Sequence, residues 1–354
     1  MSSTRIVKVD PLSPDENCLK EAAAILAKGG LVIIPTETVY GIAVNAAEHR
    51  AIERLSAIKE RPKDKPFSLH IDAKERIEDF VQDVPTPAYK LMHRFWPGPL
   101  TLIFKSKDEK TIGIRFPDDD VALRVISLSG VDVVCPSANI SGKPAPINFA
   151  DAIKDLEGLV DFAIDAGDTR LGMESSVVDL TVEPLRILRE GAIKKEEIEG
   201  VAKKKSILFI CTGNSCRSVM AKALLEKKLE EEGRQENIEV LSGGLMMSEG
   251  LGATEEVKEL LAREGIDVSG HRSHKVSKEI IGKSDVILVM EKIHEQKILE
   301  LAPQAKNKLF LLKEFAKIKD SNLDIADPIG RAPEFYSQTL GVIKEAVERV
   351  SKLI

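Results

Sequence analysis

Residues 206–218 read Ser206-Ile-Leu-Phe-Ile210 followed by Cys211-Thr-Gly-Asn-Ser-Cys-Arg-Ser218. The apolar run predicts a buried strand, and a helical pattern follows Ser218. A loop that joins a strand end to a helix start points several backbone N–H groups at one spot, which favours a phosphate and a thiolate alike. Because Arg217 follows Cys211 after five intervening residues, the stretch predicts cleavage of a phosphate ester or phosphoramidate through a cysteinyl-phosphate.

The rest of the second half continues the alternation of strand and helix that this stretch begins. Strands are expected at Ile207–Ile210, Ile238–Leu241, Val286–Val289 and Leu309–Leu312. Helices are expected at Val219–Glu232, Thr254–Glu264, His294–Leu301 and Glu334–Leu353. This rhythm predicts a doubly wound parallel sheet, with a ligand site at the carboxyl ends of its strands, where Cys211 lies.

The length of 354 residues indicates two α/β domains. A charged stretch at 191–205 predicts a short helix and a linker, so we place the domains at residues 1–203 and 204–354. No apolar run has the length of a membrane span and the start lacks a signal-peptide pattern, which predicts a cytoplasmic protein without membrane contact. The net charge of −6 argues against an extensive nucleic-acid surface.

The cysteines and histidines predict no metal site. The four cysteines form no Cys-x-x-Cys pair and are too few to staple the chain, although Cys211 and Cys216 share a loop and could form a reversible disulfide. His271 and His274 lie three apart, but no cluster of Cys or His accompanies them, so we expect surface histidines.

The first half mixes helices and strands without a regular rhythm. Ser13-Pro14-Asp15-Glu16 predicts a helix start with a capping box, and the helix should run to Lys28 and stop at Gly29-Gly30. A second helix is expected at Ala51–Lys59, and strands are expected at Leu31–Ile34, Val131–Cys135, Phe162–Asp165 and Val177–Leu180. The pattern predicts an α/β domain with a mixed, twisted sheet.

Polar clusters stand at the ends of these elements. They are Pro35-Thr-Glu-Thr-Val-Tyr-Gly41, then Lys59-Glu-Arg61-Pro62 with Lys65 and His70 behind it, and Pro136-Ser-Ala-Asn139. Taken singly, each could be a turn or a cation that complements a helix dipole. Together they suit a polyphosphate and a small polar substrate.

Residues 1–200 resemble the YrdC-type threonylcarbamoyl-AMP synthase family. The matching motifs follow in order: Thr36–Gly41, Lys59–Pro62, Trp96-Pro-Gly-Pro-Leu-Thr101, Pro136-Ser-Ala-Asn139-Ile-Ser-Gly142, Gly172-Met-Glu-Ser-Ser176 and Leu188-Arg-Glu-Gly191. The resemblance implies condensation of L-threonine, bicarbonate and ATP, with Mg²⁺, to threonylcarbamoyl-AMP and pyrophosphate. It also implies a downstream tRNA threonylcarbamoyl-transferase machinery as partner.

The same resemblance assigns site residues. It places Thr38, His70, Ser137 and Ser175 around threonine, Lys59 in the anionic centre, Arg115 as a further substrate contact, and Arg61, Lys65, Asn139 and Arg189 on ATP. Joining a carbamate to a triphosphate requires cations and oriented donors, which these residues would supply.

Residues 206–354 resemble the low-molecular-weight protein-tyrosine-phosphatase superfamily. The markers are Cys211–Ser218, Ser242-Gly-Gly244, Gly265-Ile-Asp-Val-Ser-Gly-His-Arg-Ser273, Asp285-Val-Ile-Leu-Val-Met290 and Asp327-Pro328. The resemblance implies Cys211 as nucleophile, Ser218 as donor to its thiolate, Arg217 on the phosphate oxygens and Asp327 as acid and base. The loop residues Thr212, Gly213, Asn214, Ser215 and Cys216 would surround the phosphate, and Cys216 would trap an oxidised Cys211 as a disulfide.

The substrate is expected to be phosphoarginine on proteins. Tyrosine phosphatases of the superfamily commonly carry tyrosines after Asp-Pro, whereas Ile329-Gly330-Arg331 stands here. Ser215 replaces a usual isoleucine and resembles the protein-arginine-phosphatase branch. Phosphotyrosine remains the alternative, as does a module that binds RNA and phosphoproteins without turnover. A carbamoyltransferase assembly is disfavoured because it would bring zinc-finger-like segments.

Overall fold

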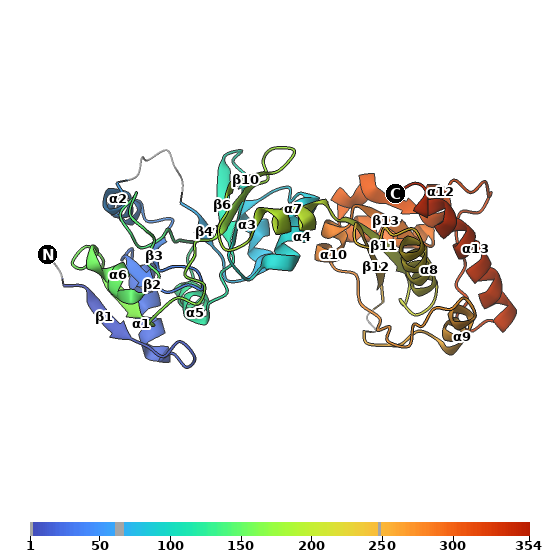
Figure 1. Ribbon diagram of the computed structural model, residues 1–354, viewed down its shortest axis with the longest axis horizontal. Helices are drawn as coiled ribbons and strands as arrows, with labels where there is room; N and C mark the ends of the chain where they lie inside the picture. Colours follow the sequence, from blue (N-terminus) through green and yellow to red (C-terminus); the bar gives the residue numbers. More distant parts are fainter. Residues whose placement is uncertain (1–2, 61–66, 247–248) are drawn as a thin grey trace. The chain divides into compact units, whose positions relative to one another are not determined.

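The computed structural model describes residues 3–60, 67–246 and 249–354. The chain folds into two compact units, Met1–Val201 and Ala202–Ile354 (Figure 1). The expected linker is absent from this junction: helix α7 (Lys195–Lys203) and strand β11 (Lys205–Cys211) leave only Lys204 between them. Ile198 is fully buried, so this charged helix is anchored by packing that its composition did not reveal.

The first unit contains a mixed sheet of ten strands, as the sequence predicts. Its order is β1-β8-β2-β3-β7-β4-β6-β5-β9-β10. Strand β2 runs parallel to β8 and antiparallel to β3. The strands are β1 (Arg5–Lys8), β2 (Val32–Ile34), β3 (Gly41–Asn45), β4 (Leu69–His70), β5 (Leu100–Lys105), β6 (Thr111–Arg115), β7 (Val133–Val134), β8 (Phe162–Asp165), β9 (Ser176–Asp179) and β10 (Arg186–Arg189).

Helices of the first unit pack on this sheet (Figure 1). They are α1 (Glu16–Ala27), α2 (His49–Ile58), the 3₁₀ turn η1 (Lys74–Arg76), α3 (Ile77–Phe80), α4 (Thr86–Phe95), α5 (Asp120–Ser129), α6 (Phe149–Lys154) and α7. Helices α1 and α5 pack together, and Leu19 and Val125 join β2 and β8 in one apolar cluster. Full burial of each such side chain contributes about 1.5–3 kcal/mol, which makes this layer the rigid support of the sheet.

Helix α1 begins later than expected. The structure places its N-cap at Asp15, whose carboxylate accepts from the N–H groups of Asn17 and Cys18, instead of at Ser13. Ser13 instead lies in a turn, where its backbone N–H donates to the Asp10 carbonyl. An aspartate caps as well as a serine, and its charge also complements the helix dipole, so the later cap prevails.

The second unit is a parallel four-stranded sheet in the order β12-β11-β13-β14, which confirms the predicted doubly wound architecture. The other strands are β12 (Ile238–Gly244), β13 (Val286–Val289) and β14 (Leu309–Leu311). The helices are α8 (Arg217–Glu231), α9 (Glu255–Arg263), α10 (Lys278–Lys283), α11 (Lys292–Leu301), η2 (Pro303–Lys308), α12 (Leu312–Phe315) and α13 (Pro333–Ser351).

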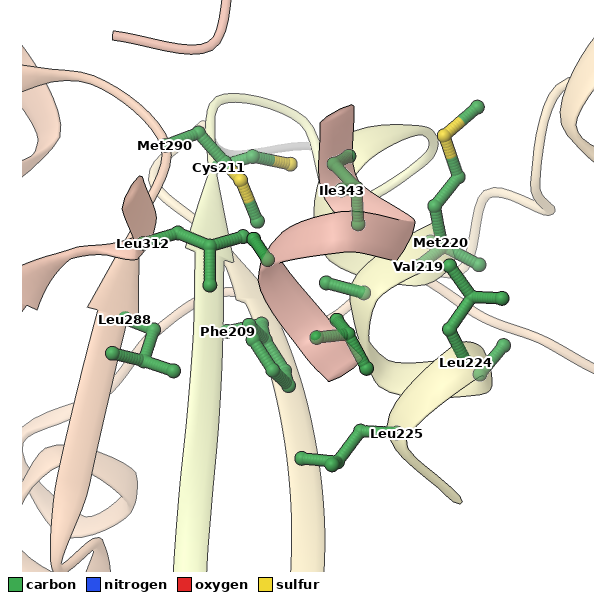
Figure 2. Packing of buried hydrophobic residues seen from close by; sticks show 14 of the residues in the cluster. Phe209, Cys211, Val219, Met220, Leu224, Leu225, Leu288, Met290, Leu312 and Ile343 are labelled. Carbon is green, nitrogen blue, oxygen red and sulfur yellow. The ribbon is translucent and has the colours of Figure 1, made fainter. Parts of the chain in front are cut away.

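Strand β11 is buried on both faces. Phe209 and Cys211 point to the layer that contains α8 and α13, and Figure 2 shows them on the side of Leu225 and Ile343. Leu208 and Ile210 join a separate cluster with α10 and α11 on the opposite face. This continuous apolar run holds the carboxyl end of β11 rigidly in place. Among the described residues, no helix is long and apolar enough to cross a membrane.

Candidate active sites

One row of residues crosses neighbouring strands of the first sheet. His70 on β4 is paired with Arg115 on β6, and Arg115 with Thr101 on β5. Thr101 is paired in turn with Val177 on β9, and Val177 with Arg189 on β10. Directly paired residues place their side chains on the same face of a sheet. The row therefore gathers an imidazole, a hydroxyl and two guanidinium groups although the chain separates them.

This row forms part of the wall of a cavity of about 140 Å³. The cavity is smaller than the roughly 300–1,000 Å³ typical of pockets for drug-sized ligands, so it suits a small polar molecule. Of the expected site residues, those in its wall are Lys59, His70, Arg115, Ser137, Ser175 and Arg189. Thr38 and Asn139 lie one hydrogen bond behind the wall. Arg61 and Lys65 lie outside the described residues.

Lys59 is held at the end of α2 by the segment that follows β7. Its Nζ donates to the Ser137 carbonyl at 2.7 Å and to Asn139 Oδ1 at 2.9 Å. Ser137 Oγ donates to the same Asn139 oxygen at 2.6 Å. The lysine is only 4% exposed. Its charge is therefore fixed in the wall, where it can stabilise an anionic group.

Arg115 lies over the loop between β2 and β3. Its Nη2 donates to Thr38 Oγ1 at 2.7 Å and lies 2.8 Å from Glu37 Oε1. The contact with Glu37 is an ion pair without hydrogen-bond geometry. Within the described chain, both carboxylate oxygens of Glu37 and Arg115 Nε lack a hydrogen-bond partner. Burial, reinforced by the Arg115 charge, lowers the pKa of His70 to about 3. His70 is therefore neutral at physiological pH and leaves the charge of this wall to Arg115.

Arg189 and Ser175 also line the cavity. Arg189 Nε donates to the Ser175 carbonyl at 2.9 Å, and Nη1 donates to Glu174 Oε1 at 2.5 Å. Ser175 Oγ is 2.9 Å from Thr101 Oγ1. The Arg189 side chain remains 41% exposed while it lines the cavity, so it can reach a ligand there.

Several wall residues were not predicted as site residues. They are Thr36, Tyr40, Ser68, Thr101 and Glu174. Thr36, Tyr40, Thr101 and Glu174 lie inside motifs that the sequence already singled out, and that was the available signal. Ser68 stands outside them and enters the site only through the register of β4.

The second site begins where β11 ends. Cys211 Sγ lies 3.0 Å from Ser218 Oγ, which also accepts from Asn214 Nδ2 at 2.9 Å. Asn214 has a φ of 52°, a left-handed conformation that ordinary residues rarely adopt. These contacts hold the loop closed around the cysteine. Cys211 itself is only 2% exposed.

His271 supports the same loop, which corrects its expected place on the surface. Its Nε2 lies 2.7 Å from the Asn214 carbonyl, and because a carbonyl only accepts, Nε2 carries the proton. The backbone N–H of His274 donates to Asn214 Oδ1 at 3.0 Å. Burial lowers the pKa of His271. His271 lies inside the marker Gly265–Ser273, and that was the available signal, but only folding brings its ring to the Asn214 carbonyl.

Arg217 is almost fully buried, at 1% exposure. Nη1 donates to Glu291 Oε2 at 2.5 Å and to the Ile325 carbonyl at 2.7 Å. Nη2 donates to Thr212 Oγ1 at 3.1 Å and to Asp327 Oδ2 at 2.5 Å. The structure thus brings the expected acid, Asp327, to the expected arginine. Glu291 was not predicted.

The remaining loop residues lie beside this centre. Cys216 is buried with Sγ 3.5 Å from Thr254 Oγ1, and both loop cysteines are free thiols. Ser215 is half-buried, and its carbonyl accepts from the Thr254 N–H at 3.2 Å. Gly213 lies against Gly244 of β12. A Cβ added to Gly244 would lie 3.0 Å from the carbonyl carbon of Gly213.

The geometry defines two classes of site. The first is a cation-lined cavity of amino-acid size across a mixed sheet. The second is a loop between a strand and a helix, on which a cysteine, an arginine and an aspartate converge. Among the described residues, no group of three or more His, Cys, Asp or Glu could hold a metal ion.

Residues 24–191 match the Sua5/YciO/YrdC family, described as "Telomere recombination". A threonylcarbamoyl-AMP synthase of Pyrococcus abyssi is 41% identical over 192 residues, which are 52% of this chain and 56% of that protein. The chain thus spans little more than half the length of this relative. A putative threonylcarbamoyl-AMP synthase of Methanocaldococcus jannaschii is 33% identical over 55% of this chain and 96% of its own length.

The structure of P. abyssi Sua5 complexed with L-threonine matches with a TM-score of 0.54 and 28% identity. The match covers 68% of this chain and 92% of that chain. Residues 206–354 match the family "Low molecular weight phosphotyrosine protein phosphatase". A protein-arginine-phosphatase of Geobacillus stearothermophilus is 39% identical over 41% of this chain and 93% of its own length. The chain therefore belongs to both families, one in each unit.

Proposed function

We propose that this protein is a bifunctional enzyme. The first unit condenses L-threonine, bicarbonate and ATP, and the second removes phosphate from proteins through a cysteinyl-phosphate. Membership of the two families supports the pairing. The assignment of individual residues rests on the geometry of the two sites.

In the first reaction the threonine amine bonds to the carbon of bicarbonate, hydroxide leaves together with the amine proton as water, and a carbamate forms. A carbamate oxygen then attacks the α-phosphorus of ATP and displaces pyrophosphate, which leaves threonylcarbamoyl-AMP. The cavity lined by Lys59, Arg115 and Arg189 carries this proposal, because anions that repel one another must meet there. Mg²⁺ brought in with ATP would offset the charge of its phosphates. The product serves threonylcarbamoylation of a tRNA adenosine.

Pyrophosphate release tests the first activity. We expect release from the full chain to require threonine, bicarbonate and ATP together. Lys59→Ala should lower the rate at least about 100-fold, since it removes a charge fixed beside the reacting anions. Lys110→Ala serves as the matched control, because the Lys110 side chain is 82% exposed. Pyrophosphate release without threonine, or equal rates in both variants, would exclude this reading.

In the second reaction Cys211 attacks phosphorus while Asp327 gives its proton to the leaving group. Asp327 then takes a proton from water, which hydrolyses the cysteinyl-phosphate and releases inorganic phosphate. The convergence of Cys211, Arg217 and Asp327 carries this proposal. Cys216, buried on the same loop, would trap an oxidised Cys211 as a disulfide. Cytoplasmic placement suits both reactions.

We propose phosphoarginine as the preferred substrate. Ser215 leaves polar space in the loop, and Asp327 can accept from a guanidinium as well as protonate it. The G. stearothermophilus relative, named for arginine phosphatase activity, supports this choice. Phosphotyrosine is the second candidate, since the matched family is described by it.

Paired kinetics decide between the two substrates. We expect kcat/KM to be higher on phosphoarginine peptides than on phosphotyrosine peptides. Ser215→Ile should shift the ratio about 10–200-fold toward phosphotyrosine. Cys211→Ser should abolish both activities, which controls for contaminating phosphatases. Faster turnover of phosphotyrosine by the wild type would reject the arginine preference, and no turnover of either would favour a binding module.

A further inference from the structure

The guanidinium of Arg217 is held by hydrogen bonds at both of its terminal nitrogens, Nη1 and Nη2. Glu291 and the Ile325 carbonyl take the hydrogens of Nη1. Thr212 and Asp327 accept from Nη2. Nε has no hydrogen-bond partner within the described chain, although it is buried. Nε–H and one N–H of Nη2 lie on a single edge of the guanidinium, and that edge is the fork that binds two phosphate oxygens.

The hydrogen bonds of His294 determine which of its nitrogens carries the proton. The Glu291 N–H donates to His294 Nδ1 at 3.2 Å, so Nδ1 is the unprotonated acceptor. The proton therefore resides on Nε2, which donates to Thr212 Oγ1 at 2.9 Å. Burial, followed by the charge of Arg217, lowers the pKa of His294 to about 4, which keeps the ring neutral at physiological pH.

Thr212 Oγ1 consequently accepts two hydrogen bonds, one from His294 and one from Arg217 Nη2. A hydroxyl oxygen has two acceptor sites, so both are filled. The hydrogen bond from His294 fixes the position of Thr212 Oγ1, the oxygen that accepts from Arg217 Nη2. On the other side, Glu291 is the N-cap of α11, and its capping box with His294 ties both side chains to the same helix turn.

We propose that the first turn of α11 positions Arg217 for phosphate, with Glu291 aligning Nη1 directly and His294 aligning Nη2 through Thr212. His294 and Glu291 are positioning residues in this scheme, since Arg217 makes the contact with substrate. The inference rests on the proposed phosphatase function. It adds a third support to the loop, apart from Asn214 and His271.

A double-mutant cycle tests the relay through Thr212. We expect His294→Ala and Thr212→Val each to lower kcat about tenfold on an aryl phosphate ester, with a smaller change in KM, because charge on the phosphoryl oxygens spreads in the transition state. The double variant should be no slower than either single variant, since both remove one shared interaction. If the fold losses in kcat of the two single variants multiplied in the double variant, the relay through Thr212 would be overturned.

Side-chain rescue separates positioning from helix capping. His294→Gln offers an amide oxygen to the Glu291 N–H and an amide N–H to Thr212, so kcat should return to within about threefold of the wild type. His294→Asn is too short to make both bonds, and it should stay slow while its unfolding midpoint remains near that of the glutamine variant. Equal kcat values in the glutamine and asparagine variants would mean that His294 acts only as a helix cap. His49→Gln, at an exposed position, is the matched control.

Protection of Cys211 from iodoacetamide by inorganic phosphate provides a readout that needs no turnover. The Kd for phosphate should rise about 3–10-fold in His294→Ala, because the fork is misaligned. Alkylation without phosphate should keep its rate, since the hydrogen bonds that the described residues give His294 go to Thr212 and Glu291. An unchanged phosphate Kd would overturn the proposal. A raised Kd in a chain without phosphatase activity would leave the positioning role standing and reject only the proposed function.

Discussion

At the scale of single residues, Asp327 occupies two roles that oppose each other. Its Oδ2 accepts from Arg217 Nη2, while its Oδ1 accepts from the Ile329 N–H. In the proposed mechanism, a bound phosphate would therefore compete with this carboxylate for Arg217, and the carboxylate would later deliver a proton.

Asp327→Asn separates these roles. Removing the carboxylate charge should tighten inorganic phosphate binding about 3–10-fold, because a competing anion is lost. It should lower kcat about 100-fold or more, because the acid and base are lost. Phosphate protection of Cys211 gives the Kd, and steady-state assays give kcat. Weaker phosphate binding in the variant would show that Asp327 supports the anion instead of competing with it.

His70 makes a residue-scale prediction about pH. Burial and Arg115 lower its pKa in the folded state to about 3, below the ordinary 6.5. The unfolded state therefore binds a proton that the folded state refuses between these values. The free energy of unfolding of the first unit should fall as pH drops through this window, by about 1.4 kcal/mol per pH unit. His70→Gln should remove that part of the slope.

The only tryptophan of the chain, Trp96, makes this measurement specific. It lies in the first unit and is 3% exposed, so its fluorescence in urea follows that unit alone. Denaturation at several pH values between 7 and 4 compares the wild type with His70→Gln. If the free energy of unfolding changed with pH equally in the wild type and in His70→Gln, the imidazole would take up its proton in the folded protein as readily as in the unfolded one.

At the scale of elements, the phosphate-binding loop depends on the end of β12. Gly244 pairs with Cys211 across the sheet and lies against the backbone of Gly213 and Asn214. The Gly244 N–H also donates to the His274 carbonyl. A side chain at this position would push the loop out of place, so the glycine is required by a close approach.

Gly244→Ala should therefore lower both activity and stability of the second unit. Its Cβ would lie 3.0 Å from Gly213 C and 3.1 Å from Asn214 N. We expect kcat to fall about tenfold and the unfolding free energy to fall about 1–3 kcal/mol. Gly341→Ala in α13, with no atom within 4 Å of its added Cβ, should instead stabilise by up to about 1 kcal/mol. Equal effects of the two variants would contradict a steric role.

At the scale of the whole molecule, each unit carries its own sheet, core and site. The two sheets share no strand, and each set of expected site residues falls within one unit. This organisation predicts that the functions are separable. It also predicts that a ligand of one site stabilises only the unit that binds it.

Separation after Lys203 tests this prediction, because α7 ends there and β11 begins at Lys205. Fragments 1–203 and 204–354 should each unfold cooperatively. Threonine with ATP should raise the melting temperature of the first fragment only, and inorganic phosphate that of the second only. A fragment that aggregates or melts without cooperativity would show that the units depend on each other for folding.

The sequence alone determined the doubly wound sheet, the mixed sheet and the two families. Strand and helix periods are local properties of the chain, and the loop from Cys211 to Ser218 holds nucleophile and arginine within a few residues. The roles assigned to individual site residues remain predictions, but the structure gathers Lys59, His70, Arg115, Ser137, Ser175 and Arg189 around one cavity.

Which distant residues complete the two sites depends on how the chain folds. The row from His70 to Arg189 exists because strands far apart in the chain are neighbours in register. Glu291 reaches Arg217 across 74 positions, and His271 reaches Asn214 across 57. These polar groups are chosen by the need to satisfy a buried guanidinium and a strained backbone once water is excluded. That requirement arises only after the chain has folded, so the sequence around Glu291 and His271 did not show which groups their side chains would contact.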